Sequence, residues 1–138
     1  MMIRKAQSGM TLIEIMIVMA IIGLIMAAAI PFGMNMLERA RIDSTKQQLK
    51  GIQQAINLFN IHTQTYPKTL KDLITKPSDP EVAADWGPQY LKKEPKDSWG
   101  NRIQYKLTPE AENEYELYSY GPKGKKSKGD RIDVWKLK

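Results

Sequence analysis

The stretch Gly9-Met10-Thr11-Leu12-Ile13-Glu14, with the uncharged run behind it, decides the fold of this chain. A short basic leader containing Arg4 and Lys5 precedes the glycine, and no charged residue occurs in residues 15–34. An apolar helix of about twenty residues is long enough to cross a bilayer. A carboxylate at the start of such a segment is costly in lipid, so we interpret Glu14 as a functional residue.

Three interpretations of the apolar segment compete. It is a removable secretory signal cut at the small residues 27–29, a plain signal anchor, or a retained helix whose leader is cut on the cytoplasmic side. A removable signal has no use for Glu14, whose carboxylate would weaken insertion by about 1–3 kcal/mol. Helical periodicity also continues beyond Ile30. We therefore favour the retained helix.

The sequence after the apolar segment predicts the amphipathic half of the same helix. We expect one long helix from about Met10 to His62, apolar all round at first and one-sided later. Gly23 and Pro31 weaken it, and Pro31 is expected to kink the helix or melt it locally. The one-sided stripe consists of Ile42, Leu49, Ile52, Ile56 and Phe59.

From residue 65 onward, prolines divide the chain into short elements. A short helix is expected at 69–75 and a loop at 76–87. Alternation and aromatic residues predict strands at 103–107, 114–120 and 133–137. A three-stranded antiparallel sheet packed on the amphipathic half of the helix would bury both apolar faces, which predicts an α+β fold.

The N-terminal stretch resembles the class III signal of type IV pilin-like proteins, commonly Gly-Phe-Thr-Leu-Ile/Leu-Glu. The resemblance implies that an inner-membrane prepilin peptidase cuts between Gly9 and Met10 and N-methylates Met10. It also implies that Glu14 pairs, in an assembled filament, with the new amine of a neighbouring subunit. The chemistry agrees, since Gly9 presents no side chain and opposite charges attract strongly in an apolar core.

The second half narrows the resemblance to the G-type major pseudopilins of type II secretion systems. Tyr66-Pro67, Tyr90-Leu91 and Asp97-Ser98-Trp99-Gly100-Asn101 are similar to that family's motifs, with Ser98 in place of a usual proline. The resemblance covers nearly the whole chain. It implies a type IV pilin-like fold, with a long N-terminal helix, transmembrane and then amphipathic, on a small sheet.

The family's calcium loop is the region where this sequence departs from the pattern. Members usually carry Gly-x-Asp-Gly and an Asp-Asp pair seven residues later; here Lys123 and Arg131 replace two of these three acids, leaving Asp130. Calcium prefers several oxygen ligands, which Lys and Arg do not supply. We expect no cofactor, and we expect Lys123 and Arg131 to pair with Asp130 instead; Asp133 and Ser119 are the other candidate calcium ligands.

Composition favours a structural protein over an enzyme. The 138-residue chain has no cysteine and one histidine, His62, which no nucleophile or phosphate-binding glycine loop accompanies. The net charge of +6 is concentrated in the last eighteen residues. The aromatic residues of the chain are typical of the core of a small domain, so no nucleic-acid partner is expected.

We therefore predict a major pseudopilin of the periplasmic fibre that drives export of folded proteins. Basic residues before the apolar helix predict a leader in the cytoplasm and a periplasmic C-terminal part, first in the inner membrane and later in the pseudopilus. Expected partners are further copies in a helical homopolymer, minor pseudopilins, the assembly platform and the prepilin peptidase. The predicted parts are a cleaved leader 1–9, a transmembrane and assembly helix 10–34, an amphipathic helix 35–64 and a globular part 65–138.

Two alternatives remain open at this stage. One is a type IV or minor pilin for adhesion, motility or DNA uptake, against which the lack of a C-terminal cysteine pair argues mildly. The other is a secreted domain, freed after residue 29, whose basic tail binds an anionic partner. The mature N-terminus separates this last alternative from a filament subunit.

Overall fold

The computed structural model describes residues 9–126 and 128–137. The predicted leader, apart from Gly9, lies outside the described residues. The chain divides into two compact units, Met1–Arg39 and Ala40–Lys138. The boundary between them falls within the long helix.

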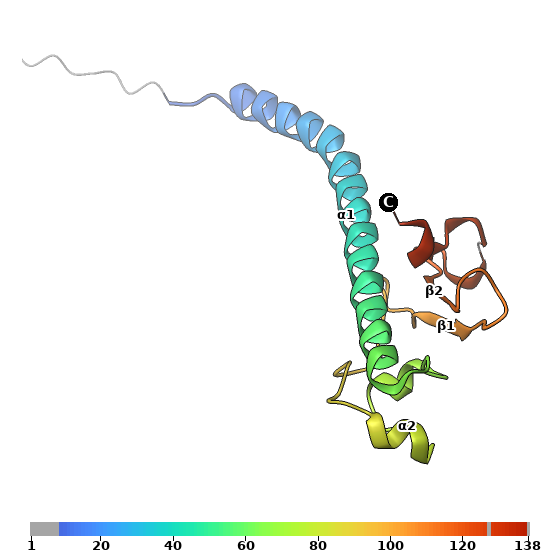
Figure 1. Cartoon of the computed structure of the whole chain (residues 1–138). Helices are drawn as coiled ribbons and strands as arrows, with labels where there is room; N and C mark the ends of the chain where they lie inside the picture. The colour runs from blue at the N-terminus through green and yellow to red at the C-terminus, as the bar shows by residue number, and fades with distance from the viewer. Residues whose placement is uncertain (1–8, 127, 138) are drawn as a thin grey trace, which may run out of the picture. The chain divides into compact units, whose positions relative to one another are not determined.

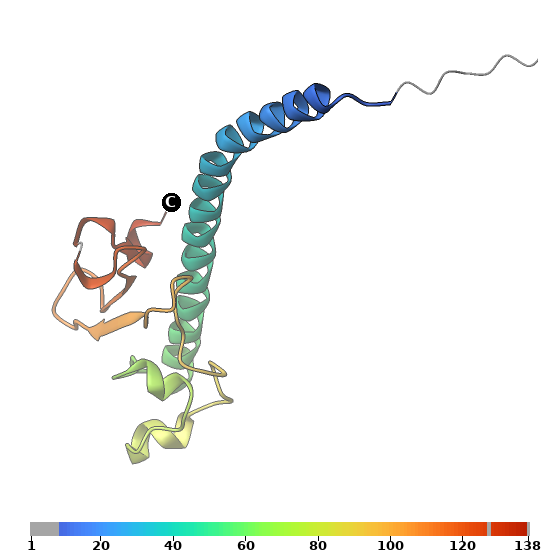
Figure 2. The same ribbon diagram turned by 180° about the vertical axis from the view of Figure 1, so that it is seen from behind.

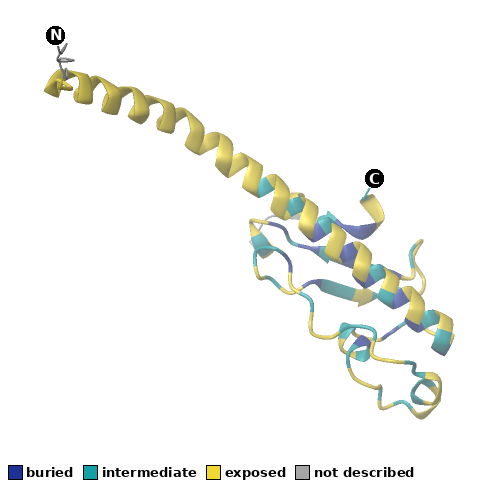
Figure 3. Ribbon diagram, turned by 90° about the vertical axis from the view of Figure 1, so that its left-hand side faces the viewer, coloured by how far each residue is buried: buried dark blue, intermediate teal, exposed yellow. Residues whose placement is uncertain are grey.

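The long helix α1 spans Leu12–Thr63, close to the predicted range (Figure 1). It is helical at Gly23 and continues without interruption through Pro31, so the alternative of local melting at Pro31 is absent from this structure. In the first unit the described residues are almost all exposed, although most are apolar (Figure 3). Of the described helices, α1 alone is long and apolar enough to cross a membrane.

The second half of α1 forms one wall of the core in the second unit. Leu49, Ile52, Ile56 and Phe59 are buried, as the predicted stripe requires, while Ile42 is half-buried. Burial at this three-and-four spacing stabilises a helix that propensity alone would not hold.

The other wall is an antiparallel sheet in the order β1-β2-β3, with β1 at Gln104–Leu107, β2 at Tyr115–Ser119 and β3 at Ile132–Asp133. Leu107 pairs with Tyr115, and Tyr118 pairs with Asp133. Tyr115, Leu117 and Ser119 alternate inward along β2. The predicted α+β fold, a long helix with a three-stranded sheet, is confirmed (Figure 2).

The predicted loop at 76–87 is wrong, because it contains helix α2 at Pro80–Asp85. The carboxylate of Asp79 accepts a hydrogen bond from the backbone N–H of Glu81 at 3.2 Å, and Pro80 occupies the first turn. Asp and Pro favour a helix start at these positions, since proline lacks only an N–H that would have no partner there. The short helix expected at 69–75 is a 3₁₀ turn at Leu70–Leu73.

The third predicted strand, 133–137, is also mostly wrong. The chain pairs only at Ile132–Asp133 and then turns into a 3₁₀ segment at Val134–Lys136. The side chain of Asp133 accepts a hydrogen bond from the backbone N–H of Trp135 at 3.1 Å. An aspartate that bonds the backbone two residues ahead favours a turn over an extended strand.

Candidate assembly and anchoring sites

Four features carry the candidate functional residues: the start of α1, its exposed apolar surface, a polar turn at 97–101 and the segment 121–133. Thr11 stands directly before α1, and its hydroxyl accepts a hydrogen bond from the backbone N–H of Glu14 at 3.3 Å. Thr-x-x-Glu is a helix-start signature, and the helix dipole favours a carboxylate in the first turn. The Thr11–Glu14 spacing therefore carries a helix-start signal in addition to the charge from which Glu14 is predicted to be functional. Gly9 and Met10 are exposed and non-helical, which leaves the bond between them accessible ahead of the helix.

The apolar surface of the first unit has no protein partner within the described chain. Side chains such as Leu12, Leu24 and Phe32 are 70–80% exposed. A contiguous apolar surface of this kind needs lipid or another protein to cover it.

Asp97 is the centre of the polar turn. It is buried, and its carboxylate accepts hydrogen bonds from the backbone N–H groups of Trp99 at 3.0 Å and Asn101 at 2.8 Å. The side-chain amide of Asn101 adds a third bond at 3.3 Å. Gly100 completes the turn with φ +85°, a conformation that glycine adopts without strain. In the Asp-x-Trp-Gly-Asn motif, the aspartate carboxylate therefore stabilises the turn by accepting hydrogen bonds from the residues that follow it.

The turn also ties α1 to β2. The hydroxyl of Ser119 donates to Asp97 at 2.6 Å and accepts from the backbone N–H of Gly121 at 2.9 Å. On the other side, the backbone N–H of Ser98 donates to the buried hydroxyl of Thr45 at 3.2 Å, and that hydroxyl donates to the Ser98 side chain at 3.0 Å. Sequence reasoning singled out the motif but not Thr45, because the two lie far apart in the chain.

Two ion pairs join described residues of the segment 121–133. Lys123 Nζ lies 2.9 Å from an oxygen of Asp130, which raises the pKa of the Lys123 ammonium. Arg131 bonds Asp133 at 2.7 Å, and that bond raises the pKa of the Arg131 guanidinium. The guanidinium also lies 3.9 Å from the ring centre of Tyr118. The predicted pairing of Lys123 with Asp130 is thus present, whereas Arg131 takes Asp133 and not the predicted Asp130.

The residues present do not fit a calcium ion. Asp130 bonds Lys123, Asp133 bonds both Arg131 and the backbone of Trp135, and Ser119 bonds Asp97. Within residues 9–126 and 128–137, no group of three metal-ligating side chains is gathered. That the protein binds no calcium stays a prediction.

Comparison with known proteins shows which family the chain belongs to. Residues 33–136 match the family model described as Type II secretion system (T2SS), protein G, and residues 4–30 match the Prokaryotic N-terminal methylation motif. The chain belongs to the type II secretion system protein G family. The type II secretion system core protein G of Pseudomonas aeruginosa is 38% identical over 131 residues, which cover 92% of each chain. That of Escherichia coli is 33% identical over 135 residues, 95% of this chain and 92% of its relative.

A solved structure agrees with the fold. The major pseudopilin from the type 2 secretion system of enterohaemorrhagic Escherichia coli superposes with a TM-score of 0.63 at 22% identity, over 75% of this chain and 94% of that chain. The apolar N-terminal helix and the methylation motif fit an inner-membrane-anchored pseudopilin of type II secretion.

Proposed function

We propose that this protein is a major pseudopilin, the structural subunit of the periplasmic fibre that drives export of folded proteins. The observation that carries the proposal is an exposed carboxylate, Glu14, one turn from the predicted cleavage point and at the head of an exposed apolar helix. The names of its relatives favour type II secretion over a type IV pilus.

In this proposal the prepilin peptidase hydrolyses the bond between Gly9 and Met10 with one water, which frees the leader, and then transfers a methyl group from a methyl-donor cosubstrate to the new amine, which gives up a proton. The processed subunit stays in the inner membrane, with its C-terminal unit in the periplasm, until the assembly platform adds it to the fibre. Copies then cover one another's apolar helices, and minor pseudopilins join the same structure. Glu14 of one copy pairs with the Met10 amine of the next, since each charge alone would be costly in the apolar interior.

The mature N-terminus tests the processing step. Intact-mass spectrometry of the membrane-extracted protein should show a chain that starts at Met10 and carries one added methyl group. A chain that starts at Ile30 would identify a removable signal peptide and overturn the proposal.

Replacement of Glu14 tests the assembly step. We expect Glu14→Leu to be inserted and cleaved normally but to reduce sheared fibres about tenfold or more, because a contact weakened by about 1.4 kcal/mol loses a factor of ten. Ile13→Leu, the adjacent uncharged change, should assemble like the wild type. Normal fibre yield from Glu14→Leu would contradict the pairing role.

A further inference from the structure

A groove of about 660 Å³ lies where α1 ends, between α2 and the turn that joins β1 to β2. Its floor is apolar and its rim is acidic. The apolar lining includes Phe59, Tyr66, Val82 and Leu107. The carboxylates of the lining are Asp72, Asp79, Glu81 and Glu114, against which Lys68 is the cation.

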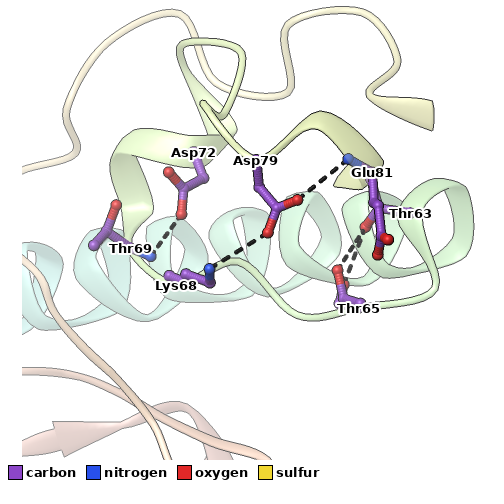
Figure 4. Close-up of polar contacts among 7 residues, drawn as sticks. All are labelled: Thr63, Thr65, Lys68, Thr69, Asp72, Asp79 and Glu81. Carbon is purple, nitrogen blue, oxygen red and sulfur yellow. Dashed lines mark hydrogen bonds and ion pairs between the residues drawn. The ribbon is translucent and has the colours of Figure 1, made fainter. Parts of the chain in front are cut away.

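The local structure fixes two carboxylates of the rim, those of Asp72 and Asp79 (Figure 4). Asp72 accepts a hydrogen bond from the backbone N–H of Thr69 at 2.9 Å, and Asp79 accepts one from that of Glu81. Lys68 lies 3.6 Å from Asp79, but its side chain is 77% exposed, so solvent screens this pair. The rim therefore keeps an excess of negative charge.

The opposite end of the same unit is basic. The segment 121–131 contains five Lys or Arg residues and one carboxylate, Asp130. Hydrogen bonds from Gly121 through Ser119 to Asp97, whose neighbour Ser98 bonds Thr45, hold the first residue of this segment near the level of Thr45 on α1. Phe59, in the groove, lies roughly 20 Å further along the helix at about 1.5 Å per residue. Figures 1 and 2 agree in placing α2 and the segment after β2 at opposite ends of the second unit.

We infer that the acidic groove receives the basic turn Gly124–Lys126 of a second copy of this chain. The inference rests on the proposed function, since a fibre of identical subunits needs one surface of a subunit to fit a different surface of the next. Head-to-tail contacts join two different surfaces, and they repeat without closing when they form a filament. Opposite charges at opposite ends of one unit have the complementarity that such a contact needs.

The rim and the floor of the groove contribute differently to this contact. The ion pairs set register and favour the correct partner, although each exposed pair contributes only about 0.2–1 kcal/mol. The apolar floor contributes binding free energy, because docking removes its surface from water. Lys123 is bonded to Asp130 and Arg131 to Asp133, and the inference assigns the exposed Lys125, in the turn Gly124–Lys126, as the cation that reaches the rim.

Cysteine crosslinking tests this contact directly, because the chain contains no cysteine of its own. The full-length double variant Glu81→Cys/Lys125→Cys is produced in the source bacterium and treated with a short bis-maleimide. We expect a ladder of covalent dimers, trimers and higher oligomers. Each single variant should give no ladder, and a mixture of the two single variants should stop at dimers.

The control pair Glu81→Cys/Lys93→Cys uses another exposed lysine, which lines a different groove. Fibres without a ladder from the Lys125 pair, an equal ladder from the Lys93 pair, or a Glu81→Cys adduct with another protein would each overturn the inference. In all three cases the proposed function would stand, because fibre formation is scored separately by shearing.

Charge reversal gives an independent readout. Lys125→Glu should reduce sheared fibres, and Glu81→Lys/Lys125→Glu should restore them. Failure of the double variant to recover any of the loss, with the protein still folded in the membrane, would also overturn the inference.

Discussion

At the scale of single residues, Ser98 provides two bonds that a proline in its place could not. Its backbone N–H and its hydroxyl both engage the buried hydroxyl of Thr45. A buried hydroxyl left without partners costs about 1–3 kcal/mol. Ser98→Pro should therefore lower the Tm of the full-length protein in detergent, measured by circular dichroism.

The matched control removes the orphaned hydroxyl as well. Thr45→Val/Ser98→Pro should recover much of the lost Tm, because replacing both partners with apolar groups is far less costly than leaving one unsatisfied. A double variant less stable than Ser98→Pro alone would show that the bond to Thr45 is not the cause.

Tyr105 predicts how stability depends on pH. Its hydroxyl donates to the carbonyl oxygen of Pro67 at 2.6 Å, and burial, aided by nearby Tyr115, raises the pKa of the Tyr105 phenol. A raised pKa means that the folded state holds this proton more tightly than the unfolded state. The stabilisation is complete below the unfolded pKa of about 10 and is lost as pH rises above it.

The Tm should therefore fall steeply above about pH 10. Tyr105→Phe should lower the Tm at pH 7, because the bond to Pro67 is lost, but it should also make the alkaline decline shallower. Thermal melts from pH 7 to 11 measure both effects, and an unchanged alkaline slope would contradict this role of Tyr105.

At the scale of elements, the sequence predicts what local pattern controls. The periodicity of α1 and the alternation of β1 and β2 are read directly, and Gly9 and Glu14 stand in a recognisable motif. Helix α2 was missed because Pro80 was treated as a breaker when it is a helix start after Asp79. The bond between Thr45 and Ser98 joins residues 53 positions apart, and no local pattern contains such a contact.

The segment 121–133 carries the prediction that calcium does not stabilise this protein. Lys123 and Arg131 already occupy the oxygens of Asp130 and Asp133. If the folded protein bound calcium, free calcium at one hundred times the Kd would add about 2.7 kcal/mol to the free energy of unfolding. The Tm in millimolar calcium should instead equal that in chelator.

The reverse substitution provides the positive control. Lys123→Asp/Arg131→Asp restores acids at the two positions where the family usually has them, and it should make the Tm rise with calcium. A calcium-dependent Tm in the wild type would show that the ion displaces the lysine and the arginine.

At the scale of the whole molecule, the described buried core and the exposed apolar half of α1 lie in different units. The second unit contains the described buried apolar core, whereas the apolar side chains of the first unit are exposed. In the proposed fibre, neighbouring copies cover these side chains. The same substitution should therefore have opposite consequences in the two units. Leu49 is fully buried in the second unit, and Leu24 is 75% exposed in the first.

Leu49→Ala should lower the free energy of unfolding by about 2–5 kcal/mol, because it leaves a cavity in the core. Leu24→Ala should leave that energy unchanged in detergent, where no neighbouring subunit covers the helix. In cells Leu24→Ala should reduce fibre yield while the protein level stays normal, whereas Leu49→Ala should reduce the protein level itself. Denaturant melts with sheared-fibre assays separate the two effects, and an equal loss of stability from both variants would show that the units do not fold independently.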